Sequence, residues 1–297
     1  MKYVDRNGKK VHKDSSQDKL LHFLYTHTWG RMLLKPLVCP EFSKLAGKFL
    51  DTGFSAKLVP SFIKSNHIDM SSYEKKEYGS FNDFFTRKIN PEARTFSPKD
   101  SDFISPCDCY ASAYSIHSNL HVSIKDTSYT VTSLLRNKKL ATHYKDGYLL
   151  VLRLTVGDYH RYHYPVSGKQ SKNHFIPGIL HTVNPIANDY IPIYKENARE
   201  YTVIRSPLFG FVTQMEVGAM LVGKICNHKQ CCTVTRGEEK GYFQYGGSTI
   251  VLLLEKDSIL LRPDLLQNTK HGFETQLPLG DTLGQAPGSQ NKNNPNG

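Results

Sequence analysis

Two adjacent glycines, a serine and a short apolar run form the stretch that most constrains how this chain can fold. Gly246 and Gly247 tolerate backbone angles that residues with a side chain resist. Ser248 follows at once, and Ile250–Leu254 has the length and apolar content of a buried strand. The stretch therefore predicts a tight turn into a core strand, with the Ser248 hydroxyl held beside its own preceding carbonyl. Such an arrangement favours attack by the hydroxyl on that carbonyl; an ordinary hairpin turn is the alternative.

The rest of the chain predicts an α+β fold. Residues 1–14 are expected to be a polar lead-in, and Ser15 or Ser16 to cap a first helix. Further helices are expected over Phe42–Leu50 and from Phe81 to Asn90-Pro91. Later apolar runs, separated by Gly, Pro, Asn and Asp, predict strands at Tyr148–Leu154, Tyr201–Val203, Val212–Val217, Met220–Ile225 and Ile250–Leu254. The expected architecture is a helical N-terminal, membrane-facing part packed on a mainly antiparallel β core.

Composition shifts suggest three regions. The chain of 297 residues is long enough for one large core. Residues 1–75 are expected to form a basic, amphipathic helical region, and residues 76–262 are expected to form the core. Residues 263–297 are expected to be a tail, partly disordered because its end is rich in Gly, Asn, Gln and Pro. No run of 18 or more apolar residues occurs, so no membrane-spanning segment is expected.

The positive charge of the chain is concentrated near its start. Residues 1–50 contain ten Lys or Arg and four Asp or Glu, which gives +6 of the total +11. Lys44 and Lys48 alternate there with aromatic and aliphatic side chains, a pattern typical of a helix lying on a membrane surface. Helices that simply pack on their own core are the alternative. An anionic partner is expected, and phospholipid is favoured over nucleic acid because no zinc-finger or RNP-like motif is present.

Two segments carry residues suited to acid–base chemistry. Asp158-Tyr-His-Arg-Tyr-His-Tyr-Pro165 places His160 and His163 three residues apart in a segment that Pro165 interrupts. A metal site is disfavoured because the glutamate and spacing of a zinc-protease helix are missing, so general acid–base work or a structural role remains. Asp108 lies in the tight turn Ser105-Pro-Cys-Asp108, where its carboxylate could orient a histidine or simply cap the turn. The six cysteines lack zinc-site spacing and are expected to be free thiols.

Taken together, these motifs resemble those of the phosphatidylserine decarboxylase family, the pyruvoyl-dependent enzymes. The resemblance covers roughly residues 80–256. The matching motifs are Phe84-Phe-Thr-Arg87 with Pro91 and Arg94, Ser105-Pro-Cys-Asp108, Asp158–Pro165, Gly178–Asn184, Glu196-Asn-Ala-Arg199, Val217–Ile225 and Gly241–Thr249. The last resembles the family's self-cleavage motif, often Leu-Gly-Ser-Thr, with Gly246 in place of the Leu. Cys109 stands where the family usually has Gly.

The resemblance implies that the chain is made as an inactive proenzyme. His163 would deprotonate Ser248 while Asp108 orients that histidine. Ser248 Oγ would attack the Gly247 carbonyl, and β-elimination would release residues 1–247 from residues 248–297. A covalent pyruvoyl group derived from Ser248 would then cap the small chain and serve as the cofactor. No metal is implied.

The same resemblance implies decarboxylation of phosphatidylserine to phosphatidylethanolamine through a Schiff base to the pyruvoyl group. His160 is the candidate donor of the proton that returns to the α-carbon. The implied partners are phosphatidylserine, an anionic membrane surface and a second copy of the chain in a homodimer. No apolar leader is visible before Lys10, so a peripheral position on the cytoplasmic face, in bacteria the inner membrane, is expected.

Three other functions remain open from the sequence. The same motifs would serve a pyruvoyl-dependent decarboxylase of a soluble amino acid such as tryptophan. An unprocessed lipid-binding module on the same fold would retain Ser248 without cleaving it. A metal hydrolase built on His160 and His163 is the third alternative.

Overall fold

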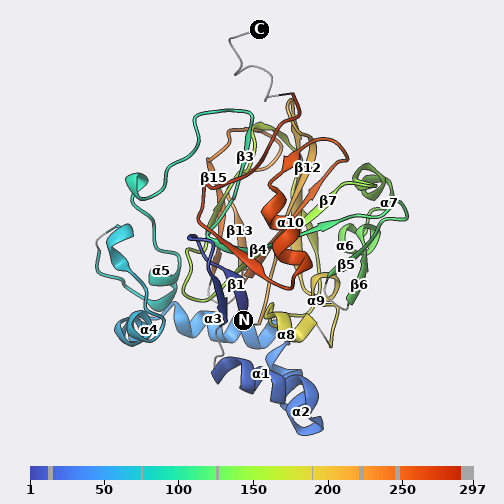
Figure 1. Cartoon of the computed structure of the whole chain (residues 1–297). Helices are drawn as coiled ribbons and strands as arrows, with labels where there is room; N and C mark the ends of the chain where they lie inside the picture. The colour runs from blue at the N-terminus through green and yellow to red at the C-terminus, as the bar shows by residue number, and fades with distance from the viewer. Residues whose placement is uncertain are drawn as a thin grey trace.

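The computed structural model has both helices and a large, mostly antiparallel sheet at its centre, as an α+β fold requires (Figure 1). The structure describes residues 1–12, 16–74, 76–124, 127–188, 190–220, 224–244 and 248–288. In these ranges the main sheet runs in the order β14-β9-β11-β12-β16-β7-β4-β18-β1-β2, and β10 pairs with β11. Its strands are β1 (Lys2–Val4), β2 (Lys10–His12), β4 (Cys109–Ser115), β7 (Tyr148–Leu154), β9 (Gly168–Gln170), β10 (His174–Ile176), β11 (Arg199–Ser206), β12 (Gly210–Val217), β14 (Thr233–Val234), β16 (Ser248–Leu254) and β18 (Glu274–Leu277).

Strand β16 is the centre of this sheet, between β12 and β7. All of its residues are buried, which explains why it reads as a continuous apolar run rather than an alternating one. The strand begins at Ser248, two residues earlier than Ile250, where it was expected to begin. Ser248 pairs with Leu154 of β7, so the serine belongs to the strand and not to the turn before it. Gly246 and Gly247 lie outside the described residues.

The other expected strands are found, with differences at their ends. The interval Tyr148–Leu154 is strand β7 as expected, while Tyr201–Val203 and Val212–Val217 lie inside the longer β11 and β12. Of Met220–Ile225, only its end belongs to a strand, β13 (Lys224–Asn227), and residues 221–223 lie outside the described ranges. Strand interiors were thus easier to predict than strand ends, because apolar content marks the buried part alone.

Helices gather at one end of the sheet, at the bottom of Figure 1. They are α1 (Ser16–Thr26), α2 (Thr28–Leu37), α3 (Pro40–Leu50), the 3-10 helix η1 (Gly53–Leu58) and α4 (Val59–Ser65). Leu24, Tyr25 and Leu34 pack into the main core. Large apolar side chains on these elements are nevertheless exposed: Leu20, Phe23, Trp29, Met32, Leu33, Phe42, Leu45, Phe49, Phe54 and Leu58. Within the described ranges, none of the helices is long and apolar enough to cross a membrane.

Short elements complete the described structure and hold the loops between the strands. The helices are η2 (Met70–Ser72), α5 (Phe81–Phe85), η3 (Pro91–Ala93), α6 (Val131–Leu135), α7 (Lys138–Ala141), η4 (Thr142–Tyr144), α8 (Pro185–Asn188), α9 (Ile193–Glu196) and α10 (Pro263–Lys270). The small sheets are β13-β15-β8, with β15 (Glu239–Gln244) and β8 (Arg161–His163); β17-β19-β3, with β17 (Leu260–Leu261), β19 (Thr282–Gln285) and β3 (Asp102–Ile104); and β5 (His121–Ile124) with β6 (Thr127–Thr130).

Three local expectations differ from what the described residues show. The helix expected from Phe81 to Asn90-Pro91 ends at Phe85, because the next residues are drawn into extended pairing, with Ile89 bridged to Tyr73. The expected lead-in contains β1 and β2, which extend the main sheet beside β18. The described part of the expected tail, residues 263–288, contains α10, β18 and β19, and β18 pairs with β4 in the main sheet. Both ends of the described chain therefore contribute strands to the main sheet.

Candidate active site

Backbone pairing brings the segments of His160 and Ser248 together. Ser248 pairs with Leu154, the last residue of β7. Six residues after Leu154, the carbonyl of His160 accepts a hydrogen bond from the amide of Phe243, at 3.0 Å. The segments 154–160 and 243–248 are therefore tied to each other at both ends. The sequence placed these residues in separate turns, and only the pairing of β7 with β16 and of β8 with β15 joins them.

The Ser248 hydroxyl is fully buried and has no hydrogen-bond partner among the described residues. The same holds for the hydroxyl of Thr249. An unpaired buried polar group costs about 1–3 kcal/mol, so native proteins retain few of them without a functional reason. A serine oxygen that no other group engages is free to act as a nucleophile once a base takes its proton.

His163 is a neutral base at physiological pH. Burial lowers the pKa of its imidazole to about 4, although Glu239 and Asp108 act in the opposite direction. Its Nδ1 atom is buried and has no partner among the residues described. Its backbone amide donates to the carbonyl of Pro106, at 2.8 Å, which ties strand β8 to the turn that carries Asp108.

The carboxylate of Asp108 is held by three hydrogen bonds. The Nε and Nη2 atoms of Arg94 donate to Oδ1 and Oδ2 at 3.1 and 2.6 Å, and the amide of Leu279 donates to Oδ1 at 2.7 Å. Asp108 thus lies in the same turn as Pro106, whose carbonyl accepts the hydrogen bond from the His163 amide. A direct hydrogen bond between the Asp108 carboxylate and His163 is not among the contacts of the described residues. The orienting role of Asp108 stays a prediction.

His160 lies deeper than His163 and is completely buried. Burial, and then the nearby Arg87 guanidinium, lower its pKa to about 3. Its Nδ1 lies 2.9 Å from the carbonyl oxygen of Asp158, which can only accept, so Nδ1 carries the proton. Nε2 therefore holds the lone pair, and it has no partner in the described part of the chain. The ring of Phe85 packs against the imidazole with centroids 4.0 Å apart.

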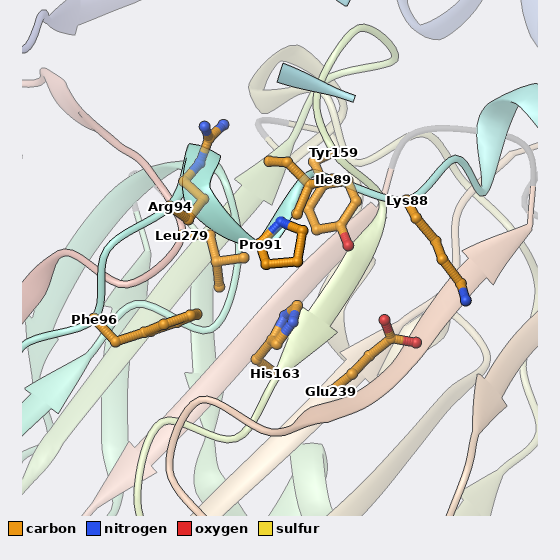
Figure 2. Close-up of a pocket in the computed structure, with 9 residues that line it drawn as sticks. All are labelled: Lys88, Ile89, Pro91, Arg94, Phe96, Tyr159, His163, Glu239 and Leu279. Carbon is orange, nitrogen blue, oxygen red and sulfur yellow. The ribbon is translucent and has the colours of Figure 1, made fainter. Parts of the chain in front are cut away.

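A cavity of about 240 Å³ opens beside His163 (Figure 2). It is lined by Lys88, Ile89, Pro91, Arg94, Phe96, Tyr159, His163, Glu239 and Leu279. Glu239 accepts hydrogen bonds from Arg161 Nη1 and His228 Nε2, both at 2.7 Å. Sequence reasoning did not assign Lys88, Tyr159 or Glu239 to the site, and no spacing signal marks them. Arg94 was visible as part of a family-like motif, but without a role.

Comparisons with known proteins match most of the chain. A family model described as phosphatidylserine decarboxylase matches residues 81–285. A phosphatidylserine decarboxylase proenzyme 2 from Clostridium acetobutylicum is 47% identical over 266 residues, which cover 89% of this chain and 91% of that protein. Phosphatidylserine decarboxylase proenzymes from Clostridium botulinum and Clostridium perfringens are 41% and 39% identical over 248 and 272 residues. These alignments cover 82% and 90% of this chain and 84% and 92% of those proteins.

Proposed function

The chain belongs to the phosphatidylserine decarboxylase family, and on that premise we propose that it converts phosphatidylserine to phosphatidylethanolamine after cleaving itself before Ser248. The observation that carries this proposal is the Ser248 hydroxyl, which is buried, has no hydrogen-bond partner among the described residues, and lies in a segment tied to that of His160. The proenzyme names of the relatives support cleavage of the precursor.

Self-cleavage uses residues of this chain alone. His163, neutral at pH 7, accepts the Ser248 proton, and Oγ attacks the carbonyl of Gly247 to convert the amide into an ester. β-Elimination removes the α-proton of Ser248 and breaks the bond from Cβ to Oγ, so residues 1–247 leave with a carboxylate on Gly247 and residues 248–297 keep a dehydroalanine at position 248. Water then hydrolyses the dehydroalanine, and ammonia is lost as the pyruvoyl group forms. Gly247 lies outside the described residues, but the absence of a side chain would leave its carbonyl open to attack.

The described residues around Ser248 fit a pyruvoyl group, since they enclose the serine and none of them forms a hydrogen bond with its oxygen. When present, that group supplies an electrophilic ketone for the substrate amine and accepts the electron pair left by departing CO₂. His160 is the proposed proton donor to the α-carbon. Because its Nε2 holds a lone pair, His160 must first take up a proton at that atom and then return it.

The substrate is a lipid, so we also propose that the protein works as a peripheral protein on an anionic bilayer. The exposed apolar side chains of α1–α3 and the +6 charge of residues 1–50 support this surface as the contact. The cytoplasmic face of a bacterial inner membrane is the proposed location, and a homodimer is the proposed assembly. Light scattering of the purified protein measures its molar mass and so distinguishes a dimer from a monomer.

The experiment that tests the enzyme is an intact-mass comparison of wild type with Ser248→Ala, followed by a CO₂ assay. Wild type is expected to yield residues 1–247 and a second fragment that is one ammonia lighter than the free peptide of residues 248–297, while the variant stays whole. Processed protein should release CO₂ from phosphatidylserine vesicles and not from free tryptophan. Release from tryptophan alone would favour the soluble-substrate enzyme, and an uncleaved wild type that binds vesicles would favour a lipid-binding module.

Vesicle flotation tests the membrane surface. Changing Trp29, Leu33 and Leu45, all more than half exposed, to Gln should abolish binding to phosphatidylserine vesicles at high salt. The matched control changes Leu208 and Leu260, which are exposed at 48% and 46% on other parts of the molecule. Equal flotation of both variants would show that α1–α3 do not insert.

A further inference from the structure

We propose that Arg94 is a positioning residue for self-cleavage, whose guanidinium fixes the Asp108 carboxylate beside His163. The inference rests on the proposed function, in which His163 is the base for Ser248. Besides Asp108, the Arg94 guanidinium donates only to the carbonyl of its neighbour Ala93 in the described structure, at 2.9 Å. Arg94 therefore acts on the reaction through Asp108.

The contact between Arg94 and Asp108 is a two-bond fork. Nε and Nη2 face Oδ1 and Oδ2 at 3.1 and 2.6 Å, and the two side chains are only 15% and 12% exposed. A planar guanidinium that engages both oxygens sets the plane of the carboxylate as well as its place. A lysine at this position would supply charge without that second bond.

A second segment holds the carboxylate from the opposite end of the sequence. The amide of Leu279 donates to Oδ1 at 2.7 Å, and the next amide, of Gly280, donates to the carbonyl of Ser105 at 3.0 Å. After cleavage, Arg94 and Asp108 would belong to the large chain and Leu279 to the small one. Asp108 would then hold the two chains together at the site, which makes its exact placement matter both before and after processing.

The carboxylate fixed in this way lies close to the base. Its turn is bonded to His163 through Pro106, and the negative charge of Asp108 acts on the imidazole, where it opposes the larger lowering of the pKa by burial. Arg94 and His163 line the same cavity (Figure 2). A carboxylate offers about four acceptor positions, and Arg94 and Leu279 use three, so one remains on Oδ2. The Nδ1 atom of His163, which has no partner among the described residues, is the group that would donate a hydrogen bond to this free position on Oδ2.

The test follows self-cleavage from the moment of synthesis. Wild type, Arg94→Met and Arg94→Lys are made in a cell-free system, and the fraction of split chain is followed on gels. The expected rate of Arg94→Met is at least about tenfold below wild type, and that of Arg94→Lys about three- to tenfold below. The control is Arg262→Met, which breaks a fork of the same geometry with Asp264, at 3.0 and 2.7 Å, outside the cavity. Its rate should stay within about twofold of wild type.

A pH profile separates positioning from mere stabilisation of the fold. The pH midpoint of self-cleavage follows the pKa of His163, the base. Without the Arg94 charge, the negative charge of Asp108 acts more strongly on His163 and should raise this midpoint, whereas Asp108→Asn removes that charge and should lower it. Wild-type rates and an unmoved midpoint in Arg94→Met, even with a lower melting temperature, would overturn the inference. If Arg94→Met does not fold, a wild-type rate in Arg94→Lys overturns it equally. A wild type that never splits would remove the proposed function, and this inference with it.

Discussion

Burial of His163 makes the stability of this protein depend on pH in a definite direction. The unfolded chain takes up a proton on this imidazole near its ordinary pKa of 6.5, whereas the folded chain resists protonation until about pH 4. Acid therefore favours the unfolded state, and the stability due to the neutral imidazole is lost as the pH falls from about 6.5 to about 4. Because one pKa unit corresponds to about 1.4 kcal/mol, the loss amounts to about 3 kcal/mol.

The perturbation that measures this loss is His163→Gln, made in a Ser248→Ala chain so that a single polypeptide unfolds. Urea unfolding followed by far-UV circular dichroism gives the free energy of unfolding of both chains between pH 7 and pH 4. The difference between them should shrink by about 3 kcal/mol on acidification, since glutamine does not titrate. The difference is the quantity to measure, because Asp158, whose pKa burial raises to about 6, acts in the opposite direction in both chains.

Tyr159→Phe is the matched control, because Tyr159 lines the same cavity and burial raises its pKa far from this pH range. Its effect on the free energy of unfolding should be the same at pH 7 and at pH 4. Parallel curves for His163→Gln and its parent would refute the reasoning, since they would mean that the folded chain protonates His163 as easily as the unfolded chain does.

Two further predictions concern the supports of the site. Lys240→Met should lower the free energy of unfolding, measured in urea, by about 3–5 kcal/mol, because it leaves the buried carboxylate of Glu216 without the ammonium that lies 2.8 Å away. The double variant with Glu216→Leu should recover most of this loss, because it removes the buried carboxylate as well. Gly241→Ala should lower the melting temperature and slow self-cleavage, because its Cβ would lie 2.1 Å from the Cys226 carbonyl oxygen and force β15 from β13. Gly47→Ala, with nothing within 4 Å, is the control and should not destabilise the fold.

Local pattern was enough to predict elements whose burial is uniform. The bounds of β7 follow from a largely apolar run, Tyr148–Leu154, in which Arg153 is the one charged residue, and the same reasoning found the interiors of β11 and β12. It failed for the helix expected from Phe81 to Asn90-Pro91, where apolar and charged residues alternate with helical spacing but the helix ends at Phe85 and Ile89 is bridged to Tyr73. It failed again after residue 262, where turn-forming residues lie next to strands that belong to the core sheets.

The candidate site divides in the same way. Ser248, His160, His163 and Asp108 could be named because their residue types, together with family-like motifs, limit the chemistry they can perform. The three hydrogen bonds on Asp108 could not be predicted, since Arg94 lies 14 residues before it and Leu279 lies 171 after it. Lys88, Tyr159 and Glu239 were missed because residues become neighbours in a cavity through folding, not through spacing.

Residue types and their order along the chain limit the chemistry that is available: a serine that follows two glycines, two histidines three residues apart, and an aspartate in a turn. Tertiary structure alone decided the state of those groups. It placed Ser248 inside a strand, made both imidazoles neutral, and attached Asp108 to Arg94. The reason is that reactivity depends on residue type, whereas burial, pKa and hydrogen-bond partners depend on which distant segments the sheet brings into contact.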